Sequence, residues 1–333
     1  MTKSIAVIRG DGIGPEVIEA ALDVLDHVDA DLELIHVDAG LACRKETGEY
    51  LPEVTLEVVR DADAVLFGAI TSPLASEDPH YKSVILGLRN ELDAYANVRP
   101  ARDLGQPCLI PGLDLVLVRE NSEGLYNAPE TEDADGVTTH RRITRNGSER
   151  VIRFAFEWAK RHERKQLHCF HKANVLRKSD GLFLSTYRDV SRAYGPGLVA
   201  KEMLLDNGAM QLVLKPQQFD TIVTMNLYGD VISDEMAGLV GGLGFAPSGS
   251  FGPRGALFEP VHGSAPDIAG KGVANPCGAI LSAAMMLEHL GFANGSRQVE
   301  DAVRAALREG RTPDAGGRLS TEAFTAHVVA SLK

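Results

Sequence analysis

Short apolar runs alternate along the chain with longer segments in which apolar residues recur every three or four positions. The short runs have the length and aliphatic content of buried strands, and they cover residues 4–8, 32–37, 64–67, 115–118, 167–171 and 221–225. The longer segments have the period of amphipathic helices. The first starts near Pro15, and the others cover about residues 80–93, 148–162, 178–192, 228–241, 277–290, 297–308 and 320–332. This alternation predicts an α/β fold with parallel strands.

Two stretches rich in glycine and proline interrupt this pattern. They cover residues 97–111 and 241–255, and both have the composition of crossovers between domains. A chain of 333 residues is long enough for about two domains. We therefore expect one domain from residues 1–98 and 252–333, and a middle domain from residues 99–251. Residues 127–140 are acidic and have no core pattern, which predicts a loop or a protruding arm over about 127–145.

The charge balance excludes some partners. Lys and Arg number 34 against 46 Asp and Glu, and the resulting net charge of −12 argues against nucleic acid or an anionic membrane as the main partner. An anionic substrate would need a local positive site. No apolar run reaches the roughly 18 residues of a membrane-spanning helix, so we expect a soluble, cytoplasmic protein. The four cysteines form no C-x-x-C pair, which is typical of buried residues in a reducing compartment.

A glycine-rich turn follows the first strand and opens the first helix. Its glycines are Gly10, Gly12 and Gly14, and the third comes one residue too early for the G-x-G-x-x-G dinucleotide motif. The turn fits two interpretations: a tight strand-to-helix connection, or a place where a ligand approaches the backbone and the helix N-terminus. This segment alone identifies no cofactor.

Three arginines lie where α/β proteins bind anionic ligands. Arg89 ends a predicted helix, Arg99 lies in the first Gly/Pro-rich stretch, and Arg119 ends the apolar run LDLVLV. The planar guanidinium group matches both oxygens of a carboxylate. An arginine taken at random is more often a solvated surface charge. Arg119 is the strongest candidate, because open α/β sheets bind ligands at the carboxyl ends of their strands.

Carboxylates and proton-transfer groups form a second set. Asp230 and Asp234 are four residues apart on a predicted helix and face the same side, where a divalent cation would relieve their repulsion. Asp206 follows another strand pattern and could add a third oxygen ligand. Lys172 follows a predicted strand and could take a proton from a hydroxyl group, and Tyr126 could donate one. Each of these residues taken alone is more often structural.

Together these stretches resemble the metal-dependent β-decarboxylating dehydrogenases, the isocitrate/isopropylmalate dehydrogenase family. The matching motifs run through nearly the whole chain: GDGIGPEV, LRNELDAYANVRP, VRENSEGLY, HKANVL, NLYGDVISD, GGLGFAPSG and EPVHGSAPDIAGKGVANP. The resemblance implies a two-domain fold with a central mixed, largely parallel sheet, and not a Rossmann dinucleotide domain. It also implies that residues 1–98 and 252–333 form the cofactor-side domain, and that residues 99–251 carry the dimer interface and the arm.

The resemblance assigns a role to each matching residue. Lys172 would act in deprotonating the substrate hydroxyl, and Tyr126 would protonate the enolate left after decarboxylation. Mg²⁺ or Mn²⁺ would be held by Asp206, Asp230 and Asp234. The residues implied to bind substrate are Ser72, Ser83, Ile85, Leu86, Arg89, Arg99, Arg119, Tyr126, Lys172 and Asn174. In this family Lys172, Asn174 and Asp206 come from the neighbouring subunit, so a homodimer with shared active sites would be the smallest active unit, and a tetramer stays open.

The resemblance also implies a nicotinamide cofactor. The residues implied to bind it are Ile70, Thr71, Ser72, Asn174, Glu259, His262, Gly263, Ser264, Ala265, Asp267 and Asn275. Asp267 can accept hydrogen bonds from a ribose 2′-hydroxyl but would repel a 2′-phosphate, which predicts NAD instead of NADP.

The segment just before Arg89 chooses the substrate in this family. Ser83 is typical of isocitrate enzymes, and the apolar pair Ile85 and Leu86 is closer to isopropylmalate enzymes, although Lys82 replaces their acid. A hydroxyl residue followed by two aliphatic residues resembles the homoisocitrate type. We therefore expect NAD-dependent oxidative decarboxylation of a 3-substituted malate, with homoisocitrate giving 2-oxoadipate in lysine biosynthesis. Isocitrate, 3-isopropylmalate in leucine biosynthesis, and a non-catalytic regulatory subunit remain as alternatives.

Overall fold

The computed structural model describes residues 2–73, 78 and 80–332, and it divides the chain into two compact units. Unit 1 consists of Met1–Ala94, Leu104–Cys108 and Gly241–Lys333, and unit 2 consists of Tyr95–Asp103 and Leu109–Val240. The chain passes from unit 1 to unit 2 after residue 94 and returns to unit 1 after residue 240. Both positions lie earlier in the chain than the boundaries expected at 98/99 and 251/252. Within the described ranges, no helix is long and apolar enough to cross a membrane.

The strands of unit 1 lie in the order β2-β1-β3-β12-β11. They are β1 (Lys3–Ile8), β2 (Leu32–His36), β3 (Ala64–Phe67), β11 (Pro247–Gly252) and β12 (Gly255–Pro260). All neighbours are parallel except β11 and β12. The helices are α1 (Gly14–Leu25), α2 (Leu41–Thr47), α3 (Glu53–Asp61), α4 (Val84–Glu91), α9 (Cys277–His289), α10 (Ala293–Glu309) and α11 (Thr321–Ser331).

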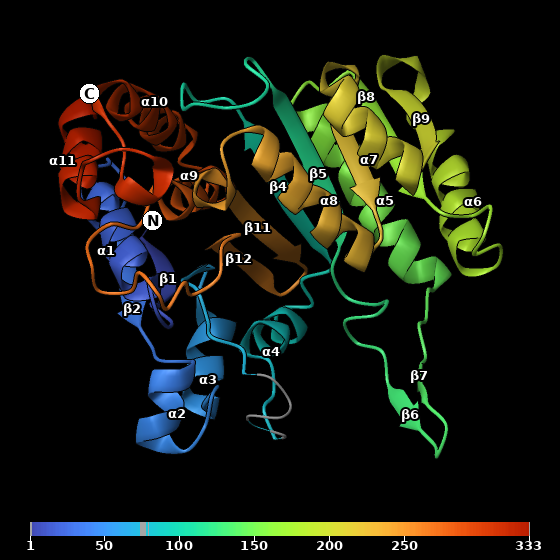
Figure 1. Ribbon diagram of the computed structural model, residues 1–333, viewed down its shortest axis with the longest axis horizontal. Helices are drawn as coiled ribbons and strands as arrows, with labels where there is room; N and C mark the ends of the chain where they lie inside the picture. Colours follow the sequence, from blue (N-terminus) through green and yellow to red (C-terminus); the bar gives the residue numbers. More distant parts are fainter. Residues whose placement is uncertain (1, 74–77, 79, 333) are drawn as a thin grey trace. The chain divides into compact units, whose positions relative to one another are not determined.

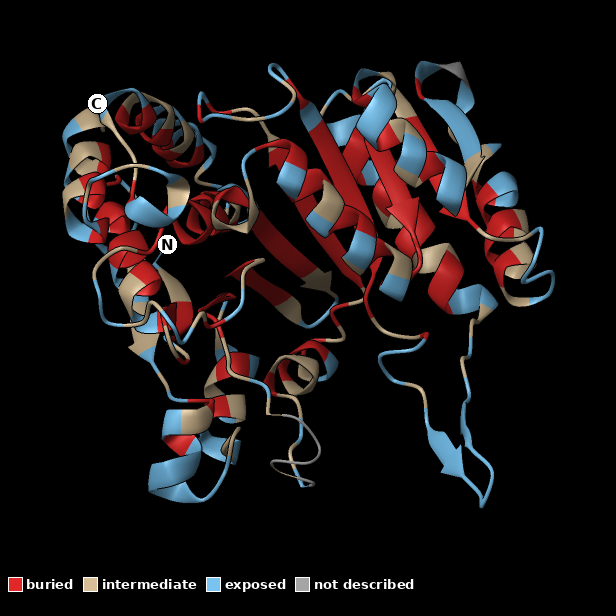
Figure 2. Cartoon of the chain, in the orientation of Figure 1, coloured by how far each residue is buried: buried red, intermediate tan, exposed pale blue. Residues whose placement is uncertain are grey.

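Residues 5–8, the last four of strand β1, are all apolar because both faces of the strand are covered there. Ile5 and Val7 join the core formed with α1, α9, α10 and α11, whereas Ala6 and Ile8 join the core formed with α3 and α4. Successive side chains of a strand point to opposite faces, so helices on both faces require an unbroken apolar run. The same cover of helices explains why β11 and β12 are coloured mostly as buried in Figure 2.

The strands of unit 2 lie in the order β4-β5-β10-β8-β9. They are β4 (Ala96–Arg102), β5 (Asp114–Glu120), β8 (Gln166–His171), β9 (Val199–Leu204) and β10 (Thr221–Thr224), and only β4 and β5 pair antiparallel. The helices α7 (Leu205–Leu214) and α8 (Asn226–Leu239) cover one face, and α5 (Arg145–Arg161) and α6 (Ser179–Ser191) cover the other (Figure 1). The predicted α/β fold with a mixed, mostly parallel arrangement of strands is confirmed.

The acidic segment forms a two-stranded hairpin. Strands β6 (Glu130–Glu132) and β7 (Val137–Thr139) pair antiparallel, and all their residues are exposed. In Figures 1 and 2 the hairpin extends away from the rest of unit 2. Of the two forms expected from the sequence, the segment therefore takes that of an arm, which we call the arm hairpin (residues 130–139).

The expected strands and helices are present, with ends shifted by a few residues. The sequence failed to predict β4 and β11, because it treated the two Gly/Pro-rich stretches only as connections, and it also did not predict β12, α2, α3 and α7. In β11 the glycines serve close packing instead: a Cβ atom on Gly252 would lie 2.2 Å from the carbonyl oxygen of Leu92. Three cysteines are buried, as expected, and Cys108 is partly exposed.

Candidate active site

In unit 2, side chains from β4 and β5 meet the first turns of α8. Arg99 Nη1 donates to Asp230 Oδ1 at 3.1 Å and lies 3.7 Å from Asp234 Oδ1. Arg119 also donates to Asp230 Oδ1, and the Tyr126 hydroxyl donates to Oδ2 of the same carboxylate. The Arg119 guanidinium lies 4.7 Å from the centre of the Tyr126 ring. Two arginines, a phenol and two carboxylates predicted from separate motifs are therefore brought together.

Two arginines face two carboxylates in this cluster, so its formal charges balance. Burial raises the pKa of Asp234; Arg99 opposes that rise and Asp230 adds to it. Burial and the hydrogen bond to Asp230 also raise the pKa of Tyr126. Asp230 and Asp234, one turn apart on α8, present carboxylate oxygens of the kind that hard divalent cations bind. These two residues therefore fit the predicted Mg²⁺ or Mn²⁺, which would stabilise both of them in the charged form.

Lys172 and Asp206 form a separate pair in unit 2. Lys172 follows β8, Asp206 lies in the first turn of α7 after the neighbouring strand β9, and their Nζ and Oδ2 atoms are 2.7 Å apart. The hydrogen bond from Lys172 lowers the pKa of Asp206. Within residues 2–73, 78 and 80–332, no group of three or more His, Cys, Asp or Glu side chains could hold a metal ion. The three predicted ligands are therefore not brought together within one chain. Asn174, two residues after Lys172, is exposed.

The predicted substrate-selecting segment lies on α4 in unit 1. Ser83 is the N-cap of this helix and accepts a hydrogen bond from the Leu86 amide at 3.4 Å. Ile85 and Leu86 are half-buried and precede the buried Arg89 by about one turn. Arg89 Nη2 donates to Glu259 at 2.9 Å, but its buried Nε has no hydrogen-bond partner in the described part of the chain. The Nε–H group of Arg89 is thus left for an anionic ligand.

The predicted cofactor loop, also in unit 1, contains buried polar atoms that lack partners. Among the residues described, His262 Nε2 and Asn275 Nδ2 are both buried without a hydrogen bond. Gly263 has open space around it, and Asp267 is exposed. Burial lowers the pKa of His262, which keeps its ring neutral. Unsatisfied buried donors and acceptors beside open space fit a loop that binds a nucleotide.

The remaining predicted cofactor residues either lie beside this loop or form hydrogen bonds with residues outside it. Thr71 donates to Ser264 at 2.8 Å, while Ile70 and Ala265 are half-buried. The exposed Ser72 hydroxyl is 3.1 Å from that of Tyr81. Glu259 pairs with Arg89, as described above.

The glycine-rich turn is filled by the chain itself. The Ile13 amide donates to the Ser264 carbonyl oxygen at 2.8 Å, and a Cβ atom on Gly12 would lie 1.9 Å from that oxygen. A Cβ atom on Gly10 would lie 2.1 Å from the carbonyl oxygen of Ala69. The turn is therefore a tight connection against which the cofactor loop packs.

Sequence reasoning missed buried polar residues that hold these loops. Asp11 accepts hydrogen bonds from the amides of Leu41 and Thr71, and so fixes the loop after β3. Asn226 accepts two hydrogen bonds from Arg119, at 3.2 and 2.8 Å. Both lie inside motifs that were already noted, GDGIG and NLYGD. Their position in the turn directly after a strand was the signal that could have identified them.

Comparison with known proteins decides the family. The family model described as isocitrate/isopropylmalate dehydrogenase matches residues 4–329. The chain belongs to the isocitrate/isopropylmalate dehydrogenase family. It is 50% identical to an isocitrate/homoisocitrate dehydrogenase of Thermus thermophilus, over 100% of this chain and 99% of that protein. It is 49% identical to a 3-isopropylmalate dehydrogenase of Methanothermobacter thermautotrophicus, over 99% of this chain and 98% of that protein.

The structural comparison agrees. The crystal structure of isocitrate dehydrogenase from Methylococcus capsulatus superposes with a TM-score of 0.95 at 40% identity, covering 99% of both chains. Isocitrate/isopropylmalate dehydrogenases oxidatively decarboxylate small malate-type substrates, are generally metal-dependent, use NAD or NADP, and generally form dimers. Relatives named for isopropylmalate and for homoisocitrate are about equally similar to this chain, so overall similarity does not separate the substrates.

Proposed function

We propose that this dehydrogenase converts homoisocitrate to 2-oxoadipate with NAD, in the cytoplasmic lysine biosynthesis that runs through aminoadipate. The observation that carries the proposal is the order of side chains along α4. Ser83 caps the helix, Ile85 and Leu86 follow, and Arg89 lies one turn later with an unpaired Nε. A hydroxyl group can bind the distal carboxylate of a tricarboxylate, and the aliphatic pair suits the extra methylene group that homoisocitrate has compared with isocitrate.

The arginines and the proton-transfer residues supply the chemistry. Arg89, Arg99 and Arg119 would bind the malate carboxylates, as bidentate donors. Lys172 would accept the proton of the substrate hydroxyl, and Tyr126 would return a proton to carbon after CO₂ has left. When bound, NAD accepts the hydride, and Mg²⁺ or Mn²⁺ supplies Lewis-acid stabilisation of the negative charge that develops on oxygen.

The cofactor loop supports NAD in particular. The exposed Asp267 carboxylate would accept hydrogen bonds from the ribose hydroxyl groups and repel the 2′-phosphate of NADP. Asp230 and Asp234 would hold the metal ion together with Asp206 from a second copy of the chain. Asp206 pairs with Lys172, and among the described residues no three acidic, His or Cys side chains come together as a metal site. Both observations support this sharing.

Exposed apolar side chains support a dimer. Met210, Val213 and Leu214 on α7, and Leu227 and Val231 on α8, are all more than a third exposed. These two helices pack against each other, so we infer that these side chains contribute to one apolar surface on unit 2. A surface of this kind marks a protein interface, and a second copy of this chain is the occupant that would also supply Asp206 and Lys172. The proposal leaves dimer and tetramer open.

A substrate panel tests the proposal. Steady-state kcat/KM would be measured for homoisocitrate, isocitrate and 3-isopropylmalate with NAD and Mg²⁺. We expect homoisocitrate to lead, and isocitrate to follow by about tenfold, because one methylene group in an apolar pocket is worth about 1–3 kcal/mol. A value for isopropylmalate about tenfold or more above both tricarboxylates would overturn the substrate assignment.

The apolar pair on α4 also favours a second candidate. Ile85 and Leu86 could bind the isopropyl group of 3-isopropylmalate, and the same panel decides between the two. A non-catalytic regulatory role is the remaining alternative, since a regulatory isocitrate dehydrogenase subunit of Dictyostelium discoideum is 41% identical over 98% of this chain and 91% of that protein. Absence of NADH formation with all three substrates would favour it.

A further inference from the structure

Asp180 is a fully buried carboxylate with no role in the chemistry described above. It lies near the start of α6, and both of its oxygens accept hydrogen bonds. Oδ2 accepts from the backbone amide of Lys172 at 2.8 Å, and Oδ1 accepts from Nη1 of Arg141 at 2.8 Å. Burying a charge is costly unless it is paired, so two strong donors are what keep this side chain stable inside unit 2.

The hydrogen bond to Lys172 closes the turn that leads from β8 into α6. The amides of Val175 and Leu176 donate to the Lys172 carbonyl oxygen at 3.0 and 2.9 Å, and the Asp180 amide donates to the Leu176 carbonyl oxygen at 3.0 Å. The Asp180 side chain in turn accepts the hydrogen bond from the Lys172 amide, which closes the turn. Both backbone polar groups that flank the Lys172 Cα atom, the amide N–H and the carbonyl oxygen, are thus held by hydrogen bonds, and this orients the side chain that reaches Asp206.

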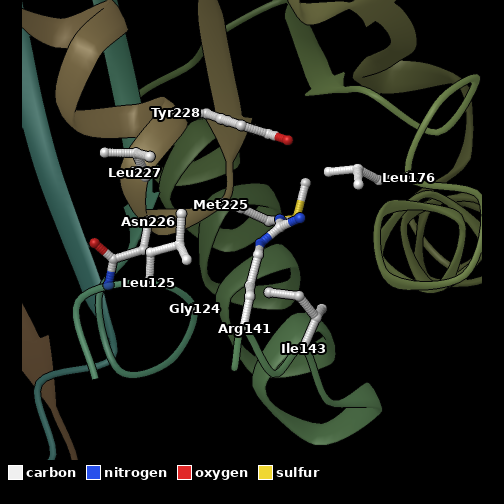
Figure 3. Close-up of a pocket in the computed structure, with 9 residues that line it drawn as sticks. All are labelled: Gly124, Leu125, Arg141, Ile143, Leu176, Met225, Asn226, Leu227 and Tyr228. Atoms are coloured by element: carbon white, nitrogen blue, oxygen red, sulfur yellow. The ribbon is translucent and has the colours of Figure 1, made fainter. Parts of the chain in front are cut away.

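Arg141, at the base of the arm hairpin, pairs with the buried Asp180 carboxylate. Its Nη2 donates to Met225 Sδ at 3.0 Å, and its guanidinium lies 5.4 Å from the centre of the Tyr228 ring. Figure 3 shows Arg141 extending toward Met225 and Leu176 beside a cavity of about 90 Å³. Burial and the nearby Asp180 raise the pKa of Tyr228. Arg141, which follows the arm hairpin, and the turn that contains Lys172 are therefore joined by the Asp180 carboxylate.

We propose that Asp180 is a positioning residue for Lys172, and that Arg141, at the base of the arm hairpin, balances its buried charge. The inference rests on the proposed role of Lys172 in proton transfer. A carboxylate suits this place because it accepts hydrogen bonds at both oxygens. An asparagine offers one acceptor, so its NH₂ group would face either the Lys172 amide or Arg141, and both of these are donors.

The experiment compares Asp180→Asn, the double variant Asp180→Asn/Arg141→Met, and wild type. Asp189→Asn is the matched control, since Asp189 is an exposed acid on the same helix that also pairs with an arginine, Arg192, at 3.0 Å. Measurements are kcat and KM for substrate and NAD, the melting temperature, and hydrogen–deuterium exchange of the peptide that contains Lys172.

We expect Asp180→Asn to lower kcat by about ten- to a hundredfold, because a small displacement of a catalytic group has effects of this size. KM for NAD should change by less than about twofold, since the cofactor loop is not involved. Exchange at the Lys172 peptide should become faster. The double variant should recover most of kcat, because it removes the second donor and frees the Asn oxygen for the Lys172 amide.

Three results would overturn the inference: unchanged exchange at the Lys172 peptide, a lower melting temperature with normal kcat, or a double variant no better than the single one. Lys172→Met is measured in parallel. An active Lys172→Met enzyme would refute the proposed role of Lys172 itself, whereas an inactive one beside a fully active Asp180→Asn enzyme would refute only the positioning by Asp180.

Discussion

At the residue scale, Lys172 is the side chain on which the proposed chemistry most depends. Replacing it with methionine keeps most of the length of the side chain and removes the amine that accepts the proton. We expect Lys172→Met to lower kcat by about 10²- to 10⁴-fold, the usual contribution of a general base, with NADH affinity nearly unchanged. Stopped-flow turnover and fluorescence titration of NADH would measure both. Lys160→Met, an exposed position at the end of α5, is the control, and wild-type kcat in Lys172→Met would refute the role.

Asp267 carries the cofactor prediction at the same scale. Lysine at this position would exchange repulsion of a 2′-phosphate for attraction. We expect Asp267→Lys to lower the NAD/NADP ratio of kcat/KM by about tenfold or more, since a charged hydrogen bond is worth about 1.5–3 kcal/mol. Asp301→Lys, exposed on α10, makes the same charge change away from the loop. An unchanged ratio in Asp267→Lys would show that this residue does not select the cofactor.

Glu120, at the end of β5, carries a pH prediction. Burial raises its pKa from 4.5 to about 7, although Ser122 and Glu123 donate hydrogen bonds to its carboxylate. The folded chain therefore binds more protons than the unfolded chain between these pH values. The contribution of Glu120 to the free energy of unfolding must fall as the pH rises from about 4.5 to 7, by at most about 3 kcal/mol, and then stay level.

Denaturant unfolding of Glu120→Gln and wild type at several pH values would measure this effect. The stability of the variant relative to wild type should rise between pH 4.5 and 7. Buried His168, with a pKa of about 4, acts with the opposite sign but is present in both proteins and cancels. Glu57→Gln, at an exposed position on α3, should show no such trend. A pH-independent difference for Glu120→Gln would contradict the prediction.

At the scale of elements, the turn from β1 to α1 depends on glycine. Gly12 has φ +61°, and its Cα faces the Ser264 carbonyl oxygen of the cofactor loop. We expect Gly12→Ala to lower the free energy of unfolding by more than about 2 kcal/mol, the combined effect of a left-handed conformation and a backbone clash. It should also raise KM for NAD, because Ser264 must move.

Gly291→Ala separates the cost of the left-handed backbone conformation from the cost of the clash with a neighbouring carbonyl oxygen. Gly291 also has a positive φ, +94°, but no atom lies within 4 Å of the added Cβ position. This variant should lose only about 1–2 kcal/mol and keep a normal KM for NAD. Equal losses in Gly12→Ala and Gly291→Ala, measured by denaturant unfolding, would show that packing against the cofactor loop is unimportant.

Helix α8 brings together the cluster of arginines, tyrosine and carboxylates in unit 2. It places Asn226 and Asp230 against Arg119, and it can do so because of Gly229, where a Cβ atom would lie 2.7 Å from Arg119 Cγ. The sequence indicated the helix and the i, i+4 spacing of Asp230 and Asp234. The sequence contained no direct signal that the glycine between Asn226 and Asp230 was the point of contact with β5.

At the scale of the whole molecule, shared active sites make a prediction that no single variant can test. Lys172→Met and Tyr126→Phe subunits would each be weakly active alone. If Lys172 serves the partner subunit and Tyr126 its own, a mixed dimer has one intact site, so random reassociation should restore about a quarter of wild-type activity. Each variant taken alone through the same dissociation and reassociation is the control. A mixture that shows only the sum of the two variants would mean that each chain builds its own site.

The sequence by itself determined the fold class and the family, and it indicated the residues of the candidate site. Strands that are covered on both faces appear in the sequence as unbroken apolar runs. Reactive residues at strand ends, such as Arg119 and Lys172, lie in short motifs whose order along the chain is specific to the family. These features are local, because each depends on residues within a few positions of one another.

Only the tertiary structure decided which residues meet. The pairing of Arg99 with Asp230 and Asp234, the packing of Ser264 on Gly12, and the link from Arg141 through Asp180 to Lys172 all join residues that are distant in the chain. The glycines of β11 misled the sequence interpretation for the same reason. A glycine needed for close backbone approach and a glycine in a flexible connection have the same local pattern, and only the neighbouring strand or helix distinguishes them.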